Sequence, residues 1–144
     1  MKATTLAVTL AMIWAMNLAA LPIAAAADIE LRDSWVRVSA PGVPVAAGYV
    51  LIVNSGSADD ELLSASSPRA ASVQIHETSM SEGMMRMREV DSVRVPARGR
   101  IALEPNGLHL MIMGLDTSVK PQGSLPIRLR FKRAGEIERV FEVR

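Results

Sequence analysis

The sequence contains no cysteine, and this absence removes several kinds of chemistry at once. Disulfide bonds, thiolate metal ligands and cysteine nucleophiles are all excluded. A blue-copper electron-transfer centre is excluded as well, because its copper needs a cysteine thiolate beside two histidines. The stability of the folded chain must therefore come from side-chain packing and not from covalent cross-links.

Aromatic residues are also scarce, at 3% of the chain, so the core is expected to be largely aliphatic. Beyond residue 27 the aromatic residues are Trp35, Tyr49, Phe131 and Phe141. We interpret Trp35 and Tyr49 as packing residues and not as site residues, because large apolar side chains are usually buried.

Neither sign of charge is in excess, since 16 lysines and arginines face 15 aspartates and glutamates. Lys2 is the single charged residue of the first 27, so the remaining chain is close to neutral. A nucleic-acid or polyanion partner would call for a basic excess, and none is expected here.

Residues 1–27 have the layout of a cleaved secretory signal peptide. Lys2 precedes an apolar run that is interrupted at Asn17 and Pro22 and ends in an A-x-A cleavage site at Ala25-Ala26-Ala27. The alternative is an uncleaved membrane anchor, which the alanine-rich, proline-interrupted end argues against. A lipid-anchored form would need a cysteine at the cleavage point. We therefore expect a periplasmic protein whose residues 28–144 form one domain, a monomer without stable membrane insertion after cleavage.

The pattern after residue 27 is typical of short strands, because no segment keeps an apolar period of 3.6 residues. In "SLPIRLRF" the apolar side chains alternate, and the Ala134-Gly135 turn that follows predicts a hairpin with "EIERVFEV". Seven or eight strands separated by glycine and proline turns predict an all-β fold, an antiparallel sandwich or barrel. Further expected strands include Glu30–Ser39, Ala46–Val53, Arg100–Leu103 and Leu108–Leu115.

Methionine and histidine are unevenly distributed along the chain. Every methionine and histidine beyond residue 27 lies between residues 76 and 113, in "HETSMSEGMMRM" and "HLMIM". Methionines that only fill a core should be spread over all the strands, although methionine is a common gap filler. The clustering of both histidines with all these methionines favours a metal site over core filling.

The second segment can present two ligands on one face of a strand. In "GLHLMIMGL" Leu110 and Ile112 would face the core, and His109 and Met111 would share the other face. Their Cα atoms would then be roughly 6.5–7 Å apart, which lets both side chains converge on one ion. The remaining ligands would come from the first segment, in which His76 follows a strand pattern and Met87 lies beyond a turn.

Imidazole with soft, neutral thioether sulfur selects Cu(I). Zinc prefers thiolate, imidazole or carboxylate in structural sites, and calcium and magnesium prefer oxygen. We therefore expect one Cu(I) per chain.

The sequence also resembles a known family, the periplasmic PCu(A)C copper chaperones. Their motif is His, ten residues, Met, twenty-one residues and His-x-Met, and this spacing joins His76, Met87, His109 and Met111. The segments "SWVRVSAPGVPVAAGYVLIVN", "VPARG" and "LEPNGLHLMIMGL" are similar to the family as well. The resemblance implies that these four residues are the Cu(I) ligands and that the fold is a cupredoxin-like β-sandwich. Met80, Met84, Met85 and Met113 lie outside the motif and would shield the site, hand copper on or pack, with shielding or packing preferred.

The same resemblance implies a metallochaperone that delivers copper to the assembly of a respiratory oxidase copper centre. Its partner would be a copper-accepting oxidase subunit or another copper carrier. Copper buffering or tolerance with the same site is the nearest alternative. A metal-free adhesion or subunit-binding sandwich stays open, because fold alone does not fix function. An enzyme is not expected, because no convergent acid and base set is visible.

Five arginines follow the first segment closely in sequence. We interpret them as a solvated strand face, with docking of an acidic partner as a second hypothesis. They are Arg86, Arg88, Arg94, Arg98 and Arg100.

Overall fold

The computed structural model describes residues 28–40 and 42–144, and every regular element within them is a strand. The predicted signal peptide at residues 1–27 lies outside the described residues. Among those that are described, no helix is long and apolar enough to cross a membrane. The strands are β1 (Ile29–Val38), β2 (Val45–Asn54), β3 (Asp60–Ser66), β4 (Ser72–Ser81), β5 (Met84–Glu89), β6 (Val93–Val95), β7 (Gly99–Leu103), β8 (Leu108–Met113), β9 (Ser124–Phe131) and β10 (Gly135–Val143).

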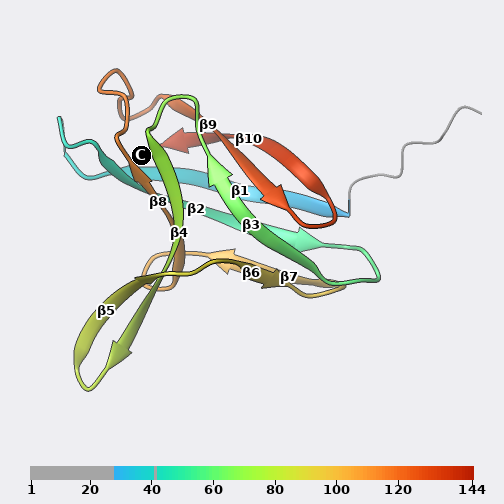
Figure 1. The fold of residues 1–144 in the computed structure, drawn as a ribbon. Helices are drawn as coiled ribbons and strands as arrows, with labels where there is room; N and C mark the ends of the chain where they lie inside the picture. Colours follow the sequence, from blue (N-terminus) through green and yellow to red (C-terminus); the bar gives the residue numbers. More distant parts are fainter. Residues whose placement is uncertain (1–27, 41) are drawn as a thin grey trace, which may run out of the picture.

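These ten strands form one sheet that curls back on itself (Figure 1). The strand order is β5-β4-β8-β2-β1-β10-β9-β3-β6, and an additional pairing between β3 and β4 joins the two sides. The first half of β2 pairs with β8, and its second half pairs with β7. The all-β prediction is thereby confirmed, with more strands than the seven or eight expected. The three-residue strand β6 is too short to produce a recognisable alternation in sequence.

One pairing differs from the predicted antiparallel arrangement. The first strand, β1, lies parallel to the last, β10, with Trp35 opposite Glu142 and Val36 opposite Val143. All other pairings are antiparallel. Local sequence patterns carry no information on the direction of a partner more than a hundred residues away, so this pairing was not predictable.

The core is aliphatic apart from two phenylalanines, as the composition predicted. The alternation in β9 holds, because Leu125, Ile127 and Leu129 are fully buried and Phe131 is 2% exposed. On the facing strands Leu110 and Ile112 of β8 are also fully buried. Trp35 and Tyr49 pack against each other on the opposite side of β1 and β2, with ring centroids 4.5 Å apart.

The β4–β5 hairpin extends beyond the body of the sheet (Figure 1). Its two-residue turn, Glu82-Gly83, has positive φ angles of 52° and 75°. Positive φ at both central residues defines a type I′ turn, whose twist matches that of the flanking strands. The turn fixes the register of the hairpin and places Met80 opposite Met85 and Thr78 opposite Met87.

A buried carboxylate fastens the β9–β10 turn to β3. Asp60 is 5% exposed and accepts hydrogen bonds from the backbone N–H groups of Glu61, Arg133 and Ala134 at 2.8 to 2.9 Å. Burial by itself would raise the pKa of Asp60, but these backbone hydrogen bonds outweigh it and lower the pKa below its usual value. The ionised side chain therefore stabilises the folded state.

Replacing Asp60 by Asn is expected to lower the free energy of unfolding at pH 7 by roughly 1–3 kcal/mol, because an amide N–H would face the N–H of Ala134. The wild-type contribution of Asp60 is complete above the unfolded pKa of about 3.9 and is lost as the pH falls through the lower folded value. The difference in the free energy of unfolding between the wild type and the Asn variant, measured by urea unfolding, should therefore become smaller between about pH 5 and pH 2. If this difference stays the same or grows in acid, the ionised Asp60 side chain does not stabilise the folded state in this way.

Candidate metal centre

The register between β4 and β8 places the two histidines directly opposite each other. His76 pairs with His109, and their ring centroids are 5.9 Å apart. Side chains opposite each other in an antiparallel pair share one face of the sheet. The two residues are 33 positions apart in sequence, and a shift of one residue in the register would separate them.

The ring of His109 is buried and held in a defined orientation. The side chain is 5% exposed, and its Nδ1 lies 3.0 Å from the backbone carbonyl of Gly107. The carbonyl can only accept, so Nδ1 carries the proton and Nε2 keeps its lone pair. The same carbonyl accepts a hydrogen bond from the N–H of Thr78 at 3.1 Å, which ties the loop before β8 to β4.

The ring of His76 has one satisfied nitrogen and one that is not. Its Nε2 lies 3.0 Å from Oε1 of Gln74, the residue two positions earlier on the same face of β4. With Nε2 as the donor, the lone pair is on Nδ1. That atom is buried and has no hydrogen-bond partner within the described part of the chain. A buried polar atom without a partner is costly, and a bound metal ion would satisfy it.

Both predicted methionine ligands lie on the same face as the histidines. Met111 pairs with Gln74, and Met87 pairs with Thr78. Met87, His109 and Met111 together line a hollow of about 220 Å³, which Tyr49 also borders. The structure therefore brings three of the four predicted ligands to one hollow. His76 does not line the hollow and joins the group through its neighbour His109.

The donor set fits a soft, singly charged metal ion. Among residues 28–40 and 42–144, no group of three or more His, Cys, Asp or Glu side chains could hold a metal ion. A metal in this hollow must therefore use the thioether sulfurs, and two imidazoles with two thioethers suit Cu(I). A thioether needs no deprotonation before it binds a metal, and each imidazole only has to be neutral.

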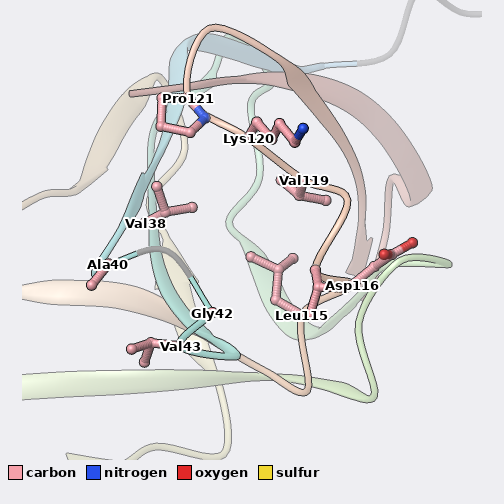
Figure 2. Close-up of a pocket in the computed structure, with 10 residues that line it drawn as sticks. Val38, Ala40, Gly42, Val43, Leu115, Asp116, Val119, Lys120 and Pro121 are labelled. Atoms are coloured by element: carbon pink, nitrogen blue, oxygen red, sulfur yellow. The ribbon is translucent and has the colours of Figure 1, made fainter.

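A larger and more apolar cavity lies elsewhere in the molecule (Figure 2). It encloses about 280 Å³ and is lined by Val38, Val43, Leu115 and Val119, with Asp116 and Lys120 beside them. Leu115 follows the end of β8, six positions after His109. This cavity has no histidine or methionine in its lining and cannot supply soft metal ligands.

The five arginines have different neighbours. Arg88 pairs with Glu77 at 2.6 Å, and Arg94 pairs with Asp59 at the same distance. Arg98 and Arg100 border a different hollow with Arg32. Docking of an acidic partner at these arginines stays a prediction.

Sequence reasoning missed the residues that hold the ligands in place. Gln74 and the carbonyl of Gly107 set which nitrogen of each imidazole is free. Gln74 could have been found from the alternation of β4, because it shares a face with His76. The Gly107 carbonyl follows a turn at Asn106, whose φ is 67°. Tyr49 was expected to be a packing residue, and it is 5% exposed, yet it also borders the hollow.

The sequence of this chain is similar to those of known proteins. The family model described as "Putative lipoprotein LpqE-like" matches residues 29–143. The "Putative lipoprotein Lxx21020" of Leifsonia xyli subsp. xyli is 34% identical over 104 residues, which cover 72% of this chain. The match spans 61% of that relative, less than two thirds of its length.

Solved structures show the same fold with copper bound. The copper-bound PCuAC domain from PmoF2 is similar with a TM-score of 0.68 and 26% identity, covering 81% of this chain and 92% of that one. The Cu(I) form of DR1885 from Deinococcus radiodurans has a TM-score of 0.62 and 26% identity, covering 90% and 83%.

These similarities confirm the predicted cupredoxin-like β-sandwich, and copper is the metal held by the two solved relatives. The family match extends over all ten strands. The chain therefore belongs to the LpqE-like family of PCuAC-type proteins.

Proposed function

We propose that this protein is an exported, periplasmic Cu(I) metallochaperone that binds one Cu(I) through His76, Met87, His109 and Met111. The observation that carries the proposal is the pairing of His76 with His109 across β4 and β8, with Met87 and Met111 on the same face. Export is supported by the layout of residues 1–27 and by the lipoprotein names of the relatives.

The arrangement is suited to carrying copper and then releasing it. The imidazoles are fixed by hydrogen bonds to Gln74 and Gly107, so little ordering is needed when the ion binds. Met87 is 52% exposed, which leaves one ligand where an incoming group can replace it. An acceptor could then take the ion by stepwise ligand exchange, with copper remaining Cu(I) throughout.

The acceptor in this proposal is a respiratory oxidase subunit whose copper centre is being assembled, or another copper carrier. No catalytic role is part of the proposal. Copper buffering would use the same ligands. A buffering protein would keep its copper when an acceptor is present, whereas a chaperone would transfer it.

A transfer experiment tests delivery. Protein loaded with one Cu(I) is mixed under anaerobic conditions with an apo oxidase copper domain, and the two are separated for metal analysis. We expect most of the copper to be found on the acceptor, and faster than from a Cu(I)–chelator complex set to the same free copper concentration. Copper that stays with the donor, or that moves no faster than from the chelator, would favour buffering over delivery.

A further inference from the structure

The β4–β5 hairpin exposes four methionines, and the four-ligand site uses only one of them, Met87. Within residues 28–40 and 42–144, four of the six exposed large apolar side chains are methionines of this hairpin. Met80 is 67% exposed, Met84 57%, Met85 63% and Met87 52%. A cluster of exposed apolar side chains on a small soluble domain usually marks a binding surface.

The register sorts these methionines between the two faces of the hairpin. Met80 lies opposite Met85, and Met87 is two residues beyond Met85 on the same face. Side chains that are directly opposite have Cβ atoms roughly 4.5–5.5 Å apart, close enough for two sulfur atoms to hold one ion. Met84 pairs with Ser81 and therefore belongs to the other face, together with Arg86.

The face that carries Met80 and Met85 is continuous with the four-ligand site. Met85 lines the same hollow as Met87, His109 and Met111. Thr78, which lies between Met80 and His76 on this face of β4, is 9% exposed and borders the hollow as well. Met87 therefore lies between the Met80–Met85 pair and the two histidines.

We propose that Met80 and Met85 form a second Cu(I) site beside Met87, an exchange site through which the ion enters and leaves the four-ligand site. The inference rests on the proposed function, because the four-ligand site is where the ion is kept. Two neutral thioethers select Cu(I) over harder ions. Methionine side chains are flexible, so they can follow an ion that moves between neighbouring positions.

The exchange site should bind more weakly than the four-ligand site, because it has no imidazole and its side chains are exposed. The transfer step is an exchange of ligands in which the ion leaves Met80 and Met85 and takes Met87 as its first ligand of the four-ligand site. As one donor leaves the ion another replaces it, and copper stays Cu(I). No oxidant, reductant or proton is consumed.

The test is a Cu(I) titration of the purified protein carrying methyl-¹³C methionine, followed by NMR under anaerobic conditions. The first equivalent should shift the methyl signals of Met87 and Met111. The second should shift those of Met80 and Met85 and leave Met84, the control on the other face of the same hairpin, in place. Equal shifts for Met84, or no change at Met80 and Met85, would overturn the exchange site.

Matched variants test the exchange site without NMR, through the number of Cu(I) ions bound per chain. Replacing Met80 and Met85 by Leu, which conserves volume, should reduce the stoichiometry from about two Cu(I) per chain to about one. Met84→Leu should leave it at about two. An unchanged stoichiometry in the double variant would also overturn the proposal.

The same titration separates the two proposals. In a variant with His109 and Met111 both replaced by Ala, the signals of Met80 and Met85 should still shift with Cu(I). If the four-ligand assignment is wrong, the first-equivalent shifts of Met87 and Met111 fail in the wild type while the Met80 and Met85 shifts remain.

Discussion

Replacing His109 and Met111 together by Ala is expected to weaken binding at the four-ligand site by well over a hundredfold. The loss of an outer partner of a metal ligand typically costs about 10–100-fold in affinity, and here two ligands are removed outright. Competition with a chromophoric Cu(I) chelator measures the change. The wild type should also gain about 2.7 kcal/mol of stability at a free copper concentration of a hundred times Kd, and the double variant should gain much less.

Two further variants keep this result interpretable. Met111→Leu conserves volume and removes only the sulfur, so weaker binding in this variant cannot result from a cavity. Met113→Ala is the control, because Met113 is half-buried on the same strand but pairs with Val45 and Ser72, away from the histidines. Wild-type affinity in the double variant would show that the ligands lie elsewhere.

The second large expected effect is a loss of folding stability when Gly114 is replaced by a residue with a side chain. Gly114 has a φ of 63°, and a Cβ atom there would lie 2.4 Å from the Cβ of Ala71. Its carbonyl and that of Met113 accept hydrogen bonds from the N–H of Ala71, which fastens the start of β4 to the end of β8. Gly114→Ala should lower the free energy of unfolding by roughly 2–4 kcal/mol, through backbone strain and a clash that the small Ala71 cannot avoid.

Gly83→Ala is the matched comparison. Gly83 also has a positive φ, 75°, but an added Cβ would meet no atom within 4 Å. Only the cost of the left-handed conformation should remain, about 1–2 kcal/mol. Urea unfolding of both variants gives the difference. If Gly114→Ala is no more destabilising than Gly83→Ala, the close approach of Ala71 is not limiting.

Much of the fold was predictable because it depends on local patterns. The alternation from Leu125 to Phe131 predicted β9 and its buried face, and the Ala134-Gly135 turn predicted the hairpin with β10. The spacing of His76, Met87, His109 and Met111 predicted the candidate ligands, and alternation placed His109 and Met111 on one face. These features involve residues that are close in sequence or a motif that is visible in it.

The remaining features depend on pairings between distant segments. Nothing near His76 indicates that it lies opposite His109, because the β4–β8 register is set by the packing of the whole sheet. His109 was expected on the face of β8 that points away from the core. It lies on that face, and it is buried there. The roles of Gln74 and of the Gly107 carbonyl are visible only once the rings have been placed.

The pairing of the first strand with the last also determines when the molecule can finish folding. Trp35 and Glu142 are neighbours across β1 and β10, although almost the whole domain separates them along the chain. Contacts between such distant segments make folding slow, because a long loop must close before they form. A chain emerging from its amino end cannot complete the sheet until its final strand is available. Until then β1 lacks one of its two partners, so the sheet cannot be completed before nearly the whole domain has been synthesised.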